Sequence, residues 1–412
     1  MDQERLLERF LRYVRIDTTA DDTVESYPSS AGQWELGKLL VEELRAIGLL
    51  DVRQDDHALV WATVPATTPR SVPVIALNAH LDTSPETSGA NVQPQVIRDY
   101  RGGDIVLPGD SQQVISTEEN PGLEQLHGCT LVTSDGTTLL GGDDKAGIAV
   151  IVETVAHLME HPEIEHGEVR ILFTCDEEIG RGVKYVDLTQ LGATACYTLD
   201  GCGAGDIDVE TFSADLATIT LHGVNIHPSI AKDRMVNAVR AASEFVARLP
   251  RRSMAPESTE GREGFMHPYL IDGGVAEAGI KVILRDFDTT KLAKQAHQLR
   301  QTAEEVEQLF PGLQVDVEVA AQYRNMRAGL DAEPRAVGYA VEAHRRLGRS
   351  PNLASIRGGT DGAMLTEQGL PTPNLSTGQH NPHSPLEWVC LDEMKQAAEI
   401  VLELVQVWAA ED

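Results

Sequence analysis

The chain has 412 residues, 42% of them hydrophobic and 24% charged, which is typical of a soluble globular protein and too long for one compact core. With 34 Lys and Arg against 64 Asp and Glu, its formal net charge at pH 7 is −30. Such a charge repels nucleic acid and anionic membranes, so we expect neither as a partner.

The N-terminal sequence and the cysteines indicate in which cellular compartment the protein is expected. The first residues contain no basic segment followed by an apolar run, so the sequence shows no signal peptide. No apolar stretch reaches the roughly 18 residues that span a bilayer. The five cysteines form no Cys-x-x-Cys pair, as expected of small core residues in a reducing compartment. We therefore expect a cytoplasmic protein.

The first half of the chain alternates predicted helices and strands. In order, the pattern predicts helices over 5–14 and 33–47, a strand over 74–77, loops over 84–125, a hairpin around 134–136, a helix over 145–159, and strands over 169–173 and 195–199. The three strands are short apolar runs, as in a buried sheet. This alternation predicts an α/β fold, a mixed sheet flanked by helices.

The middle of the chain changes pattern. It predicts a strand over 216–222, a helix over 235–249, a strand over 279–287, a helix over 288–310 and a strand over 313–320. After Tyr323 the first pattern resumes, with a helix over 333–347, a buried strand over 353–356 and a helix over 391–409. We therefore predict a catalytic domain of residues 1–213 and 323–412, interrupted by an inserted α+β lid domain of residues 214–322.

His80-Leu81-Asp82 follows the first buried strand. A spacing of two lets both polar side chains lie on one side of an extended segment. His80 can then bind a metal through one ring nitrogen while Asp82 accepts the N–H of the other. A His-x-Asp triplet is common by chance, so this motif alone does not establish a metal site.

Asp143 and Asp144 follow two glycines and open a predicted helix. An aspartate that caps the helix N-terminus is the simpler interpretation of an isolated pair. Two glycines before two aspartates also suit a tight strand-to-helix turn that brings backbone close to a ligand.

Further carboxylates follow two later strands. Asp176-Glu177-Glu178 comes after the strand over 169–173, and Asp200 after the strand over 195–199. Three adjacent carboxylates repel one another, so they form either a solvated turn or a cation site. Ligands bind at the carboxyl ends of strands in α/β sheets, which favours the cation site.

The last candidate ligand is one of two late histidines. His380 follows a polar loop, whereas His383 lies just before the apolar Trp388, where the chain re-enters packed structure. A metal ligand needs that rigidity, so we predict His383. Two histidines, three acidic ligands and one further glutamate are what two neighbouring Zn²⁺ ions need, with one carboxylate bridging and one acting as base.

These motifs resemble those of the peptidase T family, within the larger group of metallopeptidases that includes aminoacylase and glutamate carboxypeptidase. The similar segments are residues 80–85, 100–105, 138–147, 176–180, 225–228, 235–238, 284–288 and 356–363. A histidine with a glutamate four residues on, here His383 and Glu387, also matches the family. The chain departs from the family at Pro382 and Ser384 around this histidine and at Cys202, where a glycine is usual.

The resemblance implies a di-zinc catalytic domain with a lid, and release of the N-terminal residue from tripeptides. One zinc would bind His80, Asp143 and Asp200, and the other Asp143, Glu178 and His383, with Asp143 bridging. Asp82 would orient His80, and Glu177 would be the general base. The implied substrate-binding residues are His227, Asn237, Arg285 and Arg357.

The resemblance also implies two Zn²⁺ per subunit, replaceable by Co²⁺ or Mn²⁺. The expected partners are short peptides with a free N-terminus, and a homo-oligomer is left open. Instead of binding substrate, His227 could have a purely structural role. Arg285 and Arg357 could instead form surface or interdomain ion pairs.

Three other functions stay open from the sequence. A related di-zinc dipeptidase, carboxypeptidase or N-acyl amino acid hydrolase would use the same metals. Residues 133–137 are similar to a magnesium phosphatase loop but have Thr133 in place of the nucleophilic aspartate. A non-catalytic metal-binding homologue is disfavoured, because Glu177 is retained beside Glu178 and a pure binding protein needs no base.

Overall fold

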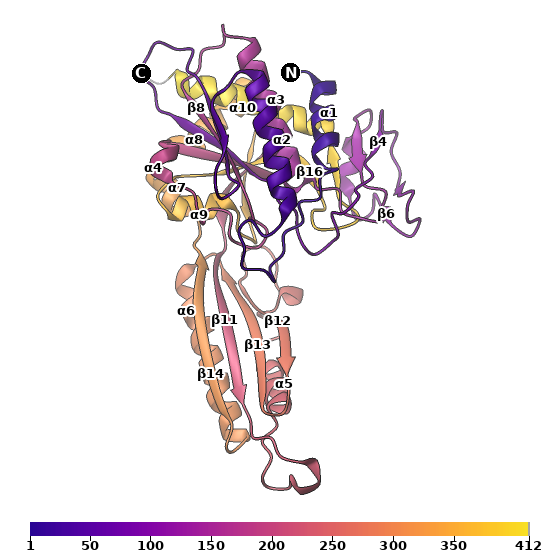
Figure 1. Cartoon of the computed structure of the whole chain (residues 1–412), viewed down its shortest axis with the longest axis vertical. Helices are drawn as coiled ribbons and strands as arrows, with labels where there is room; N and C mark the ends of the chain where they lie inside the picture. Colours follow the sequence, from indigo (N-terminus) through magenta and orange to yellow (C-terminus); the bar gives the residue numbers. More distant parts are fainter. Residues whose placement is uncertain (411–412) are drawn as a thin grey trace. The chain divides into compact units, whose positions relative to one another are not determined.

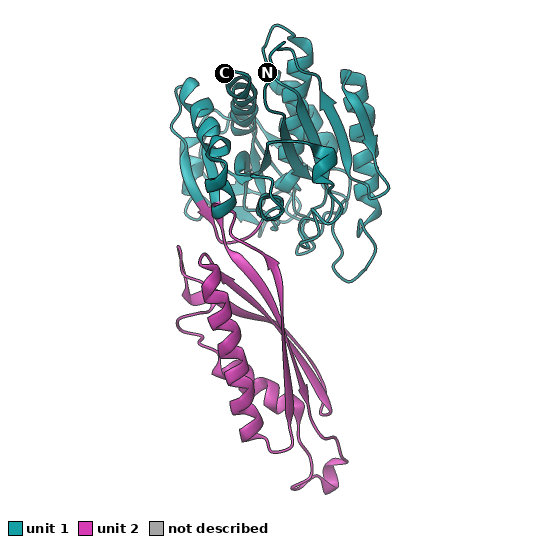
Figure 2. Cartoon of the chain, turned by 90° about the vertical axis from the view of Figure 1, so that its left-hand side faces the viewer, with its two compact units in different colours: residues 1–209, 328–354, 360–412 teal, residues 210–327, 355–359 magenta. Residues whose placement is uncertain are grey.

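The computed structural model describes residues 1–410, and the chain divides into two compact units (Figure 2). Unit 1 comprises Met1–Val209, Ala328–Ala354 and Thr360–Asp412, and unit 2 comprises Glu210–Arg327 and Ser355–Gly359. Among the described residues, no helix is long and apolar enough to cross a membrane.

The centre of unit 1 is an 11-stranded mixed sheet with the strand order β1-β2-β8-β3-β9-β16-β17-β7-β4. In addition, β10 pairs with β16, and β15 pairs with β10. The strands are β1 (Leu50–Gln54), β2 (Val60–Val64), β3 (Ile75–His80), β4 (Gln95–Ile97), β7 (Leu131–Thr133), β8 (Val169–Thr174), β9 (Ala195–Cys202), β10 (Asp206–Thr211), β15 (Asn352–Ile356), β16 (Asn374–His380) and β17 (Trp388–Cys390). The neighbours β8, β3, β9 and β16 run parallel. Every residue of β3 is buried, so both faces of the sheet are covered there.

Helices cover this sheet (Figure 1). They are α1 (Gln3–Tyr13), α2 (Ala31–Ile47), α3 (Gly142–Glu160), α4 (Leu188–Leu191), α7 (Arg327–Ala332), α8 (Pro334–Arg346), α9 (Asp361–Glu367) and α10 (Leu391–Ala409). α3 and α10 pack on the central strands and on each other, and α1 packs on α3. The carboxylate of Asp2 caps α1, and Gly48 ends α2 in the left-handed conformation. The mixed α/β fold predicted from the sequence is confirmed.

The loop-rich stretch predicted over 84–125 contains short regular elements and its own hydrophobic cluster. β4 lies in it, followed by β5 (Ile105–Val106), β6 (Val114–Ile115) and the 3₁₀ helix η1 (Pro121–Gln125). Tyr100, Leu107 and Leu123 pack there with Trp388 of β17. Apolar burial therefore holds this long connection against the segment that follows β16.

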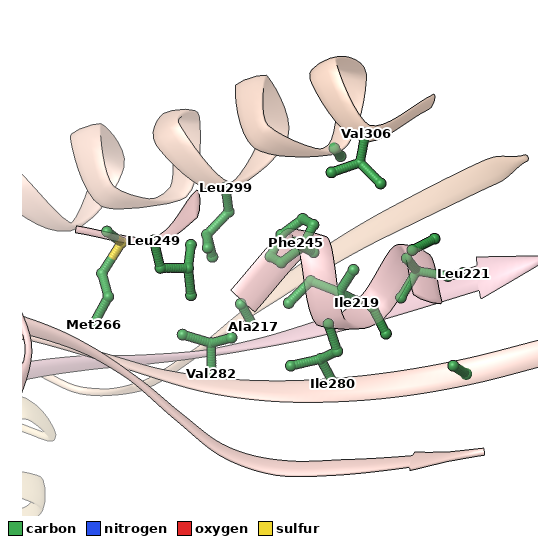
Figure 3. Close-up of a cluster of buried hydrophobic side chains, with 14 of the residues drawn as sticks. Ala217, Ile219, Leu221, Phe245, Leu249, Met266, Ile280, Val282, Leu299 and Val306 are labelled. Carbon is green, nitrogen blue, oxygen red and sulfur yellow. The ribbon is translucent and has the colours of Figure 1, made fainter. Parts of the chain in front are cut away.

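Unit 2 is a four-stranded antiparallel sheet with the order β12-β13-β11-β14 and two long helices. Its elements are β11 (Ser213–His222), the 3₁₀ helix η2 (Pro228–Ile230), α5 (Ala238–Arg248), η3 (Pro256–Ser258), β12 (Phe265–Gly273), β13 (Glu277–Asp286), α6 (Thr289–Leu309) and β14 (Gln314–Tyr323). Alternate residues of β11 are buried, including Ile219 and Leu221. They pack against Phe245 of α5 and Leu299 and Val306 of α6 (Figure 3). One face of the sheet thus carries the helices.

Two local predictions were wrong, and strands such as β12 were not predicted, because strand pairing is not a local property. No hairpin forms at residues 134–136, since β7 pairs with β4 and β17 instead. β15 is not buried; it pairs only with β10, and three of its five residues are exposed. β12 was not predicted, because most of its side chains are exposed and Pro268 interrupts its register, so it lacks the alternation of a half-buried strand.

Candidate metal centre

The parallel strands bring the polar motifs to one edge of the sheet. His80 is the last residue of β3, Glu177 and Glu178 follow β8, and Asp200 lies near the end of β9. His383 follows β16 by three residues. Because the carboxyl ends of parallel neighbours meet at the same edge, segments far apart in the sequence form one site.

Two groups of ligand-type side chains share Asp143. One ligand atom each from His80, Asp143 and Asp200 lie within 4.8 Å of one another, and the same is true of Asp143, Glu178 and His383. Asp143 Oδ1 is 3.0 Å from Nε2 of His80, whereas its Oδ2 is 3.5 Å from Nε2 of His383. The two oxygens of one carboxylate therefore face two separate groups, which is the arrangement of a bridging ligand.

Asp82 orients the imidazole of His80. Nδ1 of His80 lies 3.1 Å from the carbonyl oxygen of Asp82 and 3.4 Å from its Oδ1. These acceptors favour the proton on Nδ1, so the lone pair of Nε2 points at the carboxylates of Asp143 and Asp200. The Asp82 carboxylate also accepts the backbone N–H groups of Glu177 at 3.0 Å and Glu178 at 3.1 Å. Asp82 thus connects the end of β3 to the loop after β8.

The electrostatics of the two groups favour bound cations. Burial, with the nearby Asp143 carboxylate, raises the pKa of Glu178 to about 7 and that of Asp200 to about 8. Burial acts to lower the pKa of His383, but its hydrogen bonds to Asp143 and Glu178 outweigh this and raise it to about 11. Oε1 of Glu178 is buried without a hydrogen-bond partner among the described residues. Imidazole nitrogens and carboxylate oxygens in this number fit a pair of divalent ions such as Zn²⁺.

Glu177 lies next to these groups and belongs to neither of them. Burial raises its pKa well above the ordinary range, and the nearby Asp200 carboxylate adds to this effect. A carboxylate that gains a proton easily is suited to general base catalysis.

The adjacent aspartates at the start of α3 have different positions: Asp144 caps the helix, and Asp143 faces the candidate metal ligands. Asp144 Oδ1 accepts the N–H of Gly147 at 3.2 Å, which caps the regular part of the helix. Its Oδ2 accepts the N–H of His80 at 3.1 Å. Asp143 has non-helical dihedral angles and faces both ligand groups. The cap and the candidate ligand are therefore two different residues.

Asp176, the first carboxylate of its triplet, lies away from the ligand groups. It accepts the N–H of Ser29 at 2.8 Å and the side-chain amide of Gln33 at 2.7 Å. Its backbone has φ 60°, which turns the chain sharply before Glu177. Asp176 thus joins the start of α2 to the loop that carries Glu177 and Glu178.

The two late histidines have different surroundings. The ring of His380 stacks on Trp388 with a centroid distance of 3.7 Å, and its Nε2 is 2.6 Å from Oε2 of Glu393. Nε2 of His383 is 2.9 Å from Oε2 of Glu178, and its Nδ1 is 3.2 Å from Oε2 of Glu86. Glu86 thus contacts Nδ1 of His383, just as Asp82 contacts Nδ1 of His80. The sequence analysis did not identify Glu86.

Glu387 supports the Asp143 loop and was not predicted as a site residue. Its carboxylate, 1% exposed, accepts the backbone N–H groups of Leu140 at 2.7 Å, Gly141 at 2.7 Å and Asp143 at 3.0 Å. Gly141 is left-handed, with φ 83°, which lets consecutive N–H groups converge on one anion. The glutamate four residues after His383 was visible in the sequence, but its partners more than 240 residues away were not.

We expect Glu387→Gln to weaken metal binding about 10–100-fold, the usual cost of losing an outer support. An amide has only one acceptor oxygen, and its NH₂ group would face backbone donors. Competition with a chromogenic chelator measures the affinity. Glu393→Gln is the matched control, because Glu393 pairs with His380, which lies outside both ligand groups. Equal affinities in the two variants would contradict the supporting role of Glu387.

His227 and Asn237 of unit 2 both cap helices. Nδ1 of His227 accepts the N–H of Ser229 at 3.3 Å at the start of η2, which favours the tautomer with a proton on Nε2. Oδ1 of Asn237 accepts the N–H of Arg240 at 3.2 Å at the start of α5. Asn237 therefore has a structural task in unit 2, and its substrate role stays a prediction.

Arg285 and Arg357 have partners inside unit 2. Arg285 lies over the ring of Tyr323 and donates to Gln322 at 2.9 Å, and burial lowers its pKa. Arg357 donates to the carbonyl oxygens of Gly261 at 3.0 Å and Glu263 at 2.8 Å. The hydrogen-bond acceptors of both guanidinium groups in these contacts are amide or carbonyl oxygens and not carboxylates.

Comparison with known proteins identifies the family. A model of the peptidase family M20/M25/M40 matches residues 136–407. Peptidase T of Geobacillus kaustophilus is 45% identical over 406 residues, 98% of each chain. Peptidase T of Listeria monocytogenes serotype 4b is 44% identical over 98% of this chain and 99% of its own.

Solved structures support the same family. Aminopeptidase PepT from Bacillus cereus matches 99% of each chain, with a TM-score of 0.76 and 26% identity. A tripeptidase from Staphylococcus aureus shares the fold over the full length of both chains, with a TM-score of 0.77 and 24% identity. The resemblance inferred from the sequence motifs is thereby confirmed. The chain belongs to the peptidase family M20/M25/M40 and, within it, to the peptidase T group.

Proposed function

We propose that this protein is an aminopeptidase that releases the N-terminal residue of tripeptides at a centre of two metal ions, with zinc as the favoured ion. The observation that carries the proposal is the sharing of Asp143 between two ligand groups beside Glu177. A relative named peptidase T, 45% identical over 98% of both chains, supports the substrate class.

Each residue of the centre has a proposed task. His80, Asp143 and Asp200 would hold one ion, and Asp143, Glu178 and His383 the other. When bound, the two ions supply Lewis acidity that activates water and polarises the scissile carbonyl. Glu177 accepts a proton from the attacking water and delivers it to the leaving amine. Asp82 holds the His80 ring and the Glu177 backbone in place. Metal binding by His80 and proton transfer by Glu177 both require these fixed positions.

The roles of the lid residues remain part of the proposal. Residues 214–322 would act as the lid. His227, Asn237 and Arg285 of the lid, together with Arg357 from the part of the chain that follows it, would bind the substrate. A proton on Nε2 of His227 suits stabilisation of a developing oxyanion, and the guanidinium groups of Arg285 and Arg357 suit the peptide carboxylate. The excess of carboxylates at the centre of unit 1 attracts a free α-ammonium group rather than an acylated N-terminus.

The test is a panel of di-, tri- and tetrapeptides and one N-acetylated tripeptide, with identification of the released residue. We expect the free tripeptide to lose its N-terminal residue and the acetylated one to resist. A carboxypeptidase would release the other end, and an N-acyl amino acid hydrolase would accept the acetyl group. Either result would replace the proposed activity with one of its relatives.

Metal removal tests the centre itself. We expect close to two equivalents of metal per chain, with ions about 3.5–4 Å apart in a metal-bound structure. A chelator should abolish hydrolysis, and Zn²⁺, Co²⁺ or Mn²⁺ should restore it. Elemental analysis of the same sample provides the metal content. Full activity of metal-free protein would disprove the proposed centre.

A further inference from the structure

A second set of metal-ligand side chains lies at the C-terminal end of α3. His157, Glu160 and His161 each offer a ligand atom within 4.8 Å of the others. Their spacing of three and four residues places them on one face of the helix, and the two imidazole centroids are 4.3 Å apart. At 1.5 Å per residue, this set is roughly 20 Å along the helix from Asp143, so it is separate from the first centre.

Three features prepare this set for a cation. Nδ1 of His161 is 2.9 Å from Oε1 of Glu163, which favours the proton on Nδ1 and leaves Nε2 as the ligand atom. The negative end of the α3 dipole favours positive charge at its C-terminal turn. Burial, with the chain N-terminus and His161, lowers the pKa of His157, which favours the neutral imidazole that a metal binds.

Arg5 competes with a metal ion for the carboxylate of Glu160, but Arg5 also has a second carboxylate partner. Arg5 of α1 donates to both carboxylate oxygens of Glu160, from Nη1 to Oε1 and from Nη2 to Oε2, the second at 3.0 Å. Arg5 also donates to both carboxylate oxygens of the buried Glu153, at 2.8 and 2.9 Å. Glu160 can therefore turn toward a metal without leaving Arg5 unpaired. The helices α1 and α3 pack on each other here (Figure 1).

We propose that His157, Glu160 and His161 form a third metal site, which binds one Zn²⁺ ion. Two imidazoles and a carboxylate are a ligand set that suits zinc. The ion joins the last turn of α3 across residues four apart, so it stabilises that helix end in the native state only. This proposal does not depend on the activity assigned to the first centre.

The test titrates Zn²⁺ into protein that already holds its two catalytic equivalents, with heat and metal content as readouts. We expect one further equivalent and a rise in melting temperature with Zn²⁺. His157→Gln and His161→Gln should abolish both effects, and Glu163→Gln should weaken binding about 10-fold. His297→Gln, an exposed histidine on α6, is the matched control and should behave as the unsubstituted protein.

All four variants should hydrolyse the tripeptide normally, because none of these residues belongs to the first centre. The proposal would be overturned if the unsubstituted protein bound no more Zn²⁺ than the His157→Gln and His161→Gln variants. A third equivalent that persists in both of these variants would have the same consequence, since the ion would then bind elsewhere.

Discussion

Glu177→Gln is expected to lower kcat for tripeptide hydrolysis by about 10²–10⁴-fold while both metal equivalents remain bound. Glu177 lies in neither ligand group, so its replacement removes a base and no ligand. The amide keeps the size of the side chain, and the backbone N–H that donates to Asp82 is unchanged. Steady-state kinetics and metal content measured on the same preparation test both halves of the expectation.

Glu178→Ala provides the contrast for the Glu177 variant. Oε2 of Glu178 is 2.9 Å from Nε2 of His383, and its Oε1 is buried without a partner among residues 1–410. Removal of a ligand should release one metal, and activity should fall with it. If Glu177→Gln lost metal and Glu178→Ala kept both equivalents, the base and the ligand would have to be exchanged.

His383→Ala is expected to lose one metal and nearly all activity, whereas His380→Ala should keep both metals. Nε2 of His383 faces Glu178 and Asp143, the two other members of its group. His380 instead stacks on Trp388 and bonds Glu393, so its loss costs packing and about 1–3 kcal/mol of unfolding free energy. Metal content, kinetics and thermal unfolding of both variants separate the two effects.

The opposite pattern would be informative in the same experiment. If His380→Ala lost metal while His383→Ala retained it, the ligand assignment in this segment would be wrong. The two histidines are three residues apart in the same segment, so loss of metal in only one variant shows that the lost side chain and not its position in the chain is responsible. Each variant therefore serves as the control for the other.

Local patterns in the sequence determined the main elements and the chemistry of the site. The helices α1, α2, α3, α8 and α10 and the strands β3, β8 and β9 were predicted within a few residues, because periodic burial and caps act over a few neighbouring positions. Residue type alone limited the candidate ligands, since only imidazole and carboxylate groups at strand ends suit a divalent ion pair without cysteine.

Tertiary structure decided which of these candidates lie together and what supports them. Asp143 faces both ligand groups while Asp144 caps α3, and Asp176 binds Gln33 while Glu178 meets His383. These neighbours are chemically alike, so only the path of the backbone distinguishes them. The supports from Glu86 and Glu387, and the pairing of β7 and β12, join segments far apart in the chain. Such contacts depend on the strand order of the sheets, which no local pattern encodes.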